Sequence, residues 1–154
     1  MQKYLHIILA IILSFLMGLN LLSQDHEPVL KAKKSFNNAL EHYYDNEPDM
    51  AMRELRKAIR FDSLYLDPYI LMGDIYLDQQ LYDEAVDSYN EAIMIDPDFS
   101  PDLYYFAGNA SMKNKDFEAA SRYFQQGLAM GELDMGKRLE AQKMLVLANF
   151  RKEA

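Results

Sequence analysis

A pattern of small and aromatic residues recurs along this chain about every 34 residues, and this period constrains the fold more than any other feature. The clearest copy, residues 66–99, carries Tyr69, Met72, Gly73, Tyr76, Tyr82, Ala85, Tyr89, Ala92 and Pro97. One period earlier stand Ser35, Ala39, Asn46, Pro48, Ala51, Leu55, Ala58 and Ser63, and one period later Tyr104, Gly108, Lys115, Phe117, Ala120, Phe124 and Gly127. A period of this length predicts one supersecondary unit repeated in a row.

Each unit contains two amphipathic helical runs, for example residues 69–78 and 83–95, with apolar residues three and four positions apart. Small residues such as Gly73 and Ala85 let two helix axes approach, and the tyrosines fill the remaining space. One such pair cannot bury its apolar face alone, so the pairs must stack. We expect an all-α chain without strands, with helices near residues 29–45, 49–61, 67–79, 82–95, 101–114, 116–130 and 134–151.

This order of large, small and aromatic residues, with Ala85 and Ala92 seven apart and a closing Asp96-Pro97, resembles the tetratricopeptide repeat. The resemblance implies a right-handed α-solenoid of three helix pairs, at residues 32–65, 66–99 and 101–133. Residues 24–31 are expected to form a linker and the start of the first helix. The first copy is the most degenerate.

Residues 134–154 are expected to form a capping helix that covers the last apolar edge. Asp134 can cap its N-terminus. Its apolar face should consist of Leu139, Ala141, Leu145, Ala148 and Phe150, whereas Lys137, Arg138, Lys143, Arg151 and Lys152 should face water.

The N-terminal segment reads as an export signal. Lys3 precedes an apolar run from Tyr4 to Leu22, and the first carboxylate is Asp25. We expect residues 1–23 to be a signal peptide cleaved after Ser23, or else an uncleaved membrane anchor, because about 18 residues of helix just span a bilayer. Both interpretations predict that the repeats are exported from the cytoplasm. The ending Leu21–Gln24 resembles signals of Bacteroidetes-type bacteria, which favours a periplasmic or secreted protein.

Composition excludes several classes of function. The chain has no Cys and only three His, so thiolate metal sites, a cysteine nucleophile and a histidine-rich centre are unavailable. A net charge of −8 argues against binding nucleic acid. No phosphate loop or nucleophile elbow is present. We therefore expect no enzyme activity, no cofactor and no metal.

In tetratricopeptide proteins the first helix of each pair lines a concave groove for a partner peptide or helix. The resemblance therefore implies a groove formed by Lys33, Phe36, Leu40, Tyr43, Tyr44, Asp67, Ile70, Asp74, Leu77, Asp78, Asp102, Tyr105, Asn109 and Met112. Phe36, Tyr43, Tyr44 and Tyr105 are the aromatic residues left for recognition. One subfamily grips a chaperone's C-terminal carboxylate with Lys, Asn and Arg. That clamp is absent here, because the matching places hold Phe36, Leu40, Leu71, Asp102 and Phe106, none of which donates to a carboxylate.

Charge is distributed unevenly along the chain. Residues 61–112 contain 11 Asp and Glu and no Lys or Arg, whereas 31–60 and 113–154 each carry a net charge of +2. The acidic block either steers a basic partner into the groove or only keeps the surface solvated. The favoured function is thus a non-catalytic interaction module that binds a protein or peptide, cationic or partly apolar. The alternative is a self-assembling structural subunit of a larger envelope complex.

Overall fold

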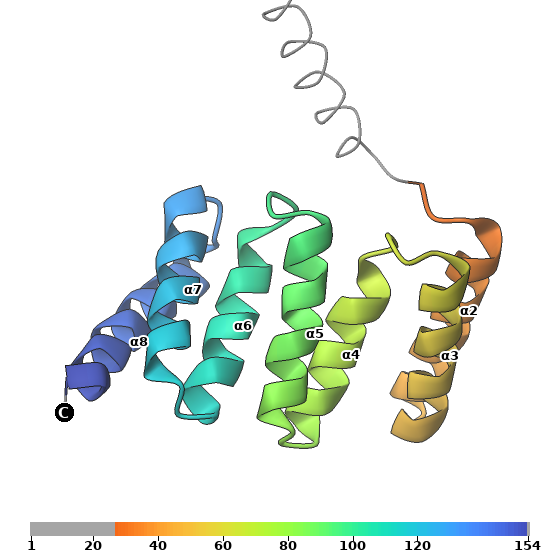
Figure 1. Cartoon of the computed structure of the whole chain (residues 1–154), viewed down its shortest axis with the longest axis horizontal. Coiled ribbons are helices and arrows are strands. Elements are labelled where there is room, and N and C mark those ends of the chain that lie inside the picture. The colour runs from red at the N-terminus through yellow and green to blue at the C-terminus, as the bar shows by residue number, and fades with distance from the viewer. Residues whose placement is uncertain (1–26, 154) are drawn as a thin grey trace, which may run out of the picture.

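The computed structural model describes residues 27–153, and its helices are labelled here as in Figure 1. They are α2 (Leu30–Tyr44), α3 (Pro48–Phe61), α4 (Asp67–Asp78), α5 (Tyr82–Ile95), α6 (Pro101–Lys113), α7 (Phe117–Met130) and α8 (Met135–Glu153). Between residues 27 and 153 there is no strand. The all-α class is confirmed, and each helix begins and ends within two residues of its predicted bounds.

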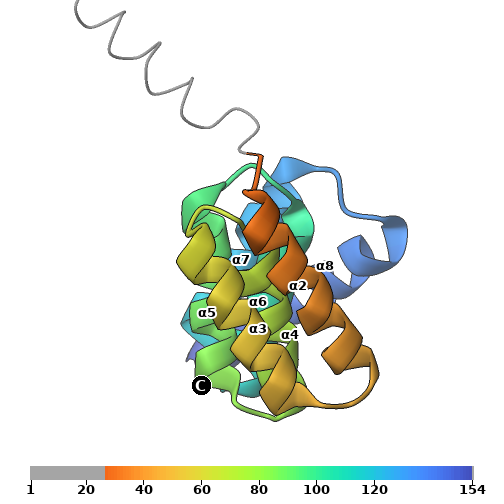
Figure 2. The ribbon, with the colours of Figure 1, turned by 90° about the vertical axis from the view of Figure 1, so that its right-hand side faces the viewer.

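The helices stand side by side in a row, with α2 and α3 at one end and α7 and α8 at the other (Figure 1). Seen along the row, α3 and α5 lie on one side, and α2 and α8 lie on the other (Figure 2). The predicted leader, residues 1–23, lies outside the described residues. None of the described helices combines the length and the apolar character needed to cross a lipid bilayer.

Close helix contact within a pair depends on glycine against an aromatic ring. A Cβ placed on Gly73 would lie 2.5 Å from Cε1 of Tyr89, and one on Gly108 would lie 2.8 Å from Cε1 of Phe124. Both rings are fully buried. The same contact therefore holds α4 to α5 and α6 to α7, one repeat apart, as the repeated glycine in the sequence requires.

The turn inside each helix pair also repeats. Asn46, Gln80 and Lys115 have φ angles of 59°, 62° and 64°, and they are the non-glycine residues with positive φ in the described part of the chain. They stand 34 and 35 residues apart. The turn geometry is thus a property of the repeat and not of a glycine.

The core consists of three clusters, and each is closed by the first helix of the following unit. Leu71 and Ile75 of α4 complete the cluster around Ala39 and Leu55. Leu103 and Ala107 of α6 complete the cluster around Tyr89. Ala141 and Ala148 of α8 complete the cluster around Phe124. α8 therefore packs over the last of the three clusters.

Two details of the predicted cap are wrong. Leu139 and Phe150 do not pack inward but are exposed, because the buried side of α8 is centred on Ala141 and Ala148. Lys137 does not simply face water but pairs with Asp102. Arg138 is exposed as predicted, and its guanidinium donates to the Gly131 carbonyl. The predicted N-cap is confirmed, since the amides of Gly136 and Lys137 donate to Asp134 Oδ1 at 2.9 and 3.0 Å.

Candidate functional site

The first helices α2, α4 and α6 present a common surface, which we call the first-helix face, and α4 gives it a row of carboxylates. Asp67, Asp74 and Asp78 are spaced by seven and four residues, so they share one side of α4. Asp78 is exposed and the other two are partly buried. Within residues 27–153 none of the three carboxylates makes an ion pair with Lys or Arg.

Asp74 is held in place from inside the repeat. The Tyr89 hydroxyl donates to Asp74 Oδ1 at 2.7 Å, and its ring reaches α4 because Gly73 has no side chain to block it. Burial raises the pKa of Asp74 above its ordinary value, the Tyr89 hydrogen bond opposes this rise, and neighbouring Asp78 adds to it. Within the row of carboxylates on α4, Asp74 is therefore held in position and only partly solvated before any partner binds.

The N-terminal part of the first-helix face is joined to the row by a tyrosine. The Tyr43 hydroxyl of α2 donates to Asp78 Oδ2 at 3.0 Å, and its ring lies 6.0 Å from that of Tyr44. Partial burial and the bond to Asp78 raise the pKa of Tyr43, so this hydroxyl stays a donor at neutral pH. Tyr44 is 79% exposed and remains available to a partner.

The C-terminal part of the face is already covered by α8. Lys137 Nζ lies 2.9 Å from Asp102 Oδ2 and 5.5 Å from the centre of the Phe106 ring. The hydrogen bond to Asp102 raises the pKa of Lys137. Tyr105, which we expected to be available for recognition, is only 8% exposed and donates to Glu140 Oε2 at 2.7 Å. Recognition by Tyr105 would require α8 to move, whereas a partner of the partly exposed Asp102 would have to compete with Lys137.

The apolar residues predicted to line the face mainly serve the core. Phe36 and Leu40 pack against the first cluster, Ile70 and Leu77 against the second, and Met112 against the third. Two polar residues complete the predicted set: Lys33 pairs with Glu27 at 2.6 Å, and Asn109 is partly buried. The charged groups of the predicted site that make no ion pair with a described residue therefore lie on α4.

Sequence reasoning missed Tyr89, Lys137 and Glu140 as partners of the face. A signal for two of them exists in the sequence spacing. Lys137 follows Asp102 by 35 residues and Glu140 follows Tyr105 by 35, as Asp78 follows Tyr43. First helices one repeat apart contact each other at this spacing, so α8 occupies the place of a further first helix.

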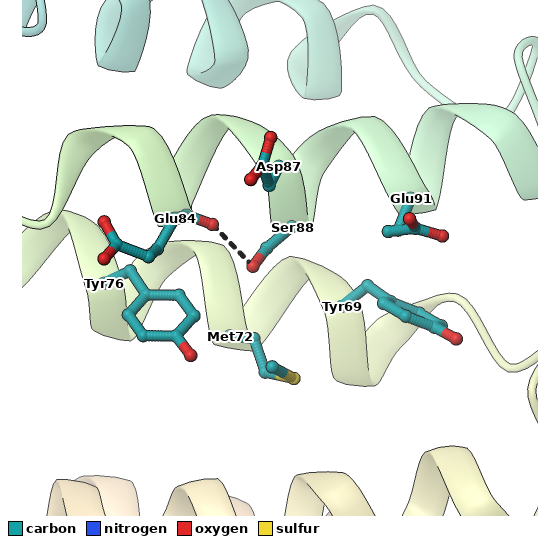
Figure 3. Close-up of a pocket in the computed structure, with 7 residues that line it drawn as sticks. All are labelled: Tyr69, Met72, Tyr76, Glu84, Asp87, Ser88 and Glu91. Atoms are coloured by element: carbon teal, nitrogen blue, oxygen red, sulfur yellow. Dashed lines mark hydrogen bonds between the residues drawn. The ribbon is translucent and has the colours of Figure 1, made fainter.

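A separate cleft of about 250 Å³ lies on the other side of α4, against α5 (Figure 3). Tyr69, Met72 and Tyr76 of α4 form one wall, and Glu84, Asp87, Ser88 and Glu91 of α5 form the other. The Ser88 hydroxyl donates to the Glu84 carbonyl oxygen at 2.8 Å, so it is satisfied within α5. Across residues 27–153, no three His, Asp or Glu side chains gather in a way that could hold a metal ion.

This geometry defines a solenoid of stacked helix pairs with a polar first-helix face. Two models of tetratricopeptide repeats match part of the chain: residues 73–115 match the model described as TPR repeat, and residues 101–130 match the model described as Tetratricopeptide repeat. Neither model reaches the degenerate copy at 32–65, although it folds into the pair α2 and α3. No curated protein matches the chain in sequence.

Solved structures share the fold at low sequence identity. The TPR2B domain of yeast Sti1 in complex with an Hsp70 peptide is 18% identical, with a TM-score of 0.69 over 80% of this chain and 99% of that one. The N-terminal domain of stress-induced protein-1 from C. elegans is 19% identical, with a TM-score of 0.67 over 73% and 93%. PcrH in complex with the chaperone-binding region of PopD is 18% identical, with a TM-score of 0.66 over 78% and 92%.

Proposed function

We propose that this protein is a non-catalytic interaction module that binds a basic peptide or helix on the first-helix face, at Tyr43, Tyr44, Asp67, Asp74 and Asp78. The observation that carries the proposal is the row of three carboxylates on α4, which lack a Lys or Arg partner among residues 27–153. Carboxylates placed in this way offer charge-assisted hydrogen bonds to Lys and Arg side chains.

Two features favour a cationic partner over a neutral one. Residues 61–112 carry 11 acidic and no basic side chains, so the field near α4 attracts positive charge over the distance of a Debye length. The exposed ring of Tyr44 offers a face for a cation, and it lies 6.0 Å from the ring of Tyr43, whose hydroxyl donates to Asp78. Tyr43 and Tyr89 hold two of the carboxylates in place, which lowers the entropy lost on binding.

The resemblance to peptide-binding repeat domains supports the same proposal. The yeast Sti1 structure contains an Hsp70 peptide, and the PcrH structure contains a region of PopD. Both are proteins of this fold in complex with a segment of another protein. A basic partner is our own proposal for this chain, argued from its charges.

We further propose that the module works in the bacterial envelope, outside the cytoplasm. The support is the apolar run from Tyr4 to Leu22 after Lys3, which has the composition of a signal peptide. N-terminal sequencing of the protein from its native cell tests this directly. A start at Gln24 supports export with cleavage, a start at Met1 or Gln2 in an envelope fraction supports an anchor, and recovery in the cytoplasm contradicts export.

Binding is tested on an array of basic peptides and their acidic counterparts, with the protein and two double variants. Asp74→Asn with Asp78→Asn removes two charges from the first-helix face. Glu84→Gln with Glu91→Gln removes two from α5, where neither carboxylate makes an ion pair with a described residue. We expect the first variant to lose roughly tenfold in affinity and part of its salt dependence. Equal losses in both would mean that only net charge matters, and a loss confined to the second would move the site to the cleft in Figure 3.

A further inference from the structure

The side of α8 that points away from the repeats is apolar although it faces solvent. Met135, Leu139, Val146 and Phe150, here called the α8 stripe, are 84%, 52%, 71% and 68% exposed. Their spacings of four, seven and four residues put them on one side of the helix, opposite the buried Ala141 and Ala148. The last helix of a stacked repeat array needs a polar outer side to stay soluble. The α8 stripe therefore calls for a covering partner.

The place of α8 in the repeat indicates what kind of element fits against the α8 stripe. Lys137 and Glu140 contact α6 at the 35-residue spacing that joins first helices. Two such spacings, 70 residues in total, align Leu139 of α8 with Tyr69 of α4 and Val146 of α8 with Tyr76 of α4. Tyr69 and Tyr76 pack against the cluster that contains Ala85 and Tyr89 of α5. The α8 stripe is thus the side that, in a complete pair, meets the second helix, and within residues 27–153 no helix occupies that place.

The α8 stripe is complementary to itself. Met135 and Phe150 are equally far from the midpoint between Gln142 and Lys143, and so are Leu139 and Val146. When two copies of α8 run antiparallel about a twofold axis at this midpoint, Met135 faces Phe150 and Leu139 faces Val146 of the other copy. Twofold interfaces require this kind of self-complementarity. The two helices of a repeat are also antiparallel, so a second α8 would take the position that the second helix has in a complete pair.

We propose that the protein forms a twofold dimer through antiparallel pairing of α8 with α8 of a second copy. The contact involves only one helix of each partner, so the surface that each partner buries is smaller than the roughly 800 Å² typical of a stable interface. The dimer is therefore weak and concentration-dependent. Lys143 lies beside the axis, so the Lys143 side chains of the two copies come close and repel each other. Salt screens this repulsion, so association strengthens as the salt concentration rises. Binding of a basic segment to the first-helix face has the opposite salt dependence, so the two activities are distinguishable.

The natural chain has no cysteine, which makes site-specific cross-linking a direct test. Gln142→Cys places one thiol beside the axis of the full-length protein. Gln79→Cys is the matched control, an exposed glutamine at the C-terminus of α4. Intact cells that express each variant are treated with a short bis-maleimide, and the products are separated by mass. We expect a covalent dimer with Gln142→Cys and none with Gln79→Cys.

A second pair of variants tests the register. In the Gln142→Cys background, Leu139→Glu with Val146→Glu should reduce the covalent dimer roughly tenfold, because like charges then face each other. Leu139→Lys with Val146→Glu should restore it in part, because opposite charges meet. Circular dichroism checks that each variant keeps its helices. The proposal is overturned by equal cross-linking at residues 79 and 142, by persistence in the double-glutamate variant, or by a product whose mass shows a different protein on the α8 stripe.

Discussion

Substitution of Gly73 by alanine should destabilise the protein even though alanine is the better helix former. Alanine gains about 1 kcal/mol in helix propensity. Its Cβ, however, would lie 2.5, 2.7 and 2.8 Å from three atoms of the Tyr89 ring. That ring is fully buried, and its hydroxyl is bonded to Asp74 at 2.7 Å, so it cannot move aside without loss of the bond. Overpacking costs about 1–3 kcal/mol and a hydrogen bond to a charged group about 1.5–3 kcal/mol. We expect a net loss of about 2 kcal/mol in the free energy of unfolding.

Urea unfolding followed by far-UV circular dichroism measures this difference, with two related variants beside it. Gly108→Ala should cost less, because the contacts with Phe124 are 2.8 to 3.0 Å and Phe124 has no hydroxyl to lose. Gly136→Ala is the milder comparison, since its Cβ would meet only one neighbouring atom, Asp134 Oδ1, at 3.2 Å. Adding Tyr89→Leu to Gly73→Ala should recover part of the loss by removing the clash. A Gly73→Ala protein as stable as the natural one would refute the packing argument.

Four further outcomes follow from the same contacts. Asp74→Asn keeps an acceptor for Tyr89 but removes the charge of a carboxylate whose pKa is raised by burial, so it should raise the free energy of unfolding at neutral pH. The gain should vanish below pH 3.8, the ordinary pKa of this carboxyl group, as urea titrations at both pH values would show. Burial, together with the nearby Asp74, raises the pKa of Tyr89 above its ordinary value of 10.0. The neutral Tyr89 should therefore stabilise the fold fully below pH 10, and this contribution should be lost as the pH rises further, which circular dichroism measured against pH would follow. Lys137→Ala should cost about 0.5 kcal/mol, because its ion pair with Asp102 is partly exposed, and should speed hydrogen exchange in α8. Lys115→Gly should gain about 1 kcal/mol in urea unfolding by relieving a φ of 64°, while Asn46→Gly should change little because asparagine tolerates that geometry.

The fold was predictable because its determinants are local and repeat. Gly73 and Gly108 mark the sites of close helix approach, and Tyr89 and Phe124 mark the rings that fill them, so one copy of the pattern explains the next. Asp134 predicted the start of α8 because an N-cap is a contact between neighbours in sequence. The all-α class and the helix bounds required no knowledge of long-range contacts.

The candidate site was only partly predictable, because it depends on contacts between residues far apart in sequence. The row Asp67, Asp74 and Asp78 follows from helical spacing alone. The 35-residue spacing of Tyr105 and Glu140 is compatible with a contact, but only the position of α8 relative to α6 shows that α8 covers Tyr105. The same position of α8 leaves Leu139 and Phe150 outside the core, although the apolar pattern predicted that they pack inside it.

The sequence by itself determined the repeating unit, which consists of two amphipathic helices with a glycine opposite an aromatic ring, and it determined that the central repeat is acidic. Each of these features depends on residues that lie within one or two helical turns or one repeat period of each other. Only the tertiary structure decided which of these groups remain available. Stacking turned Tyr89 toward Asp74, paired Lys137 with Asp102 and left the α8 stripe uncovered. Those outcomes depend on how whole helices approach each other, and that approach is set by the summed packing of many side chains rather than by any local pattern.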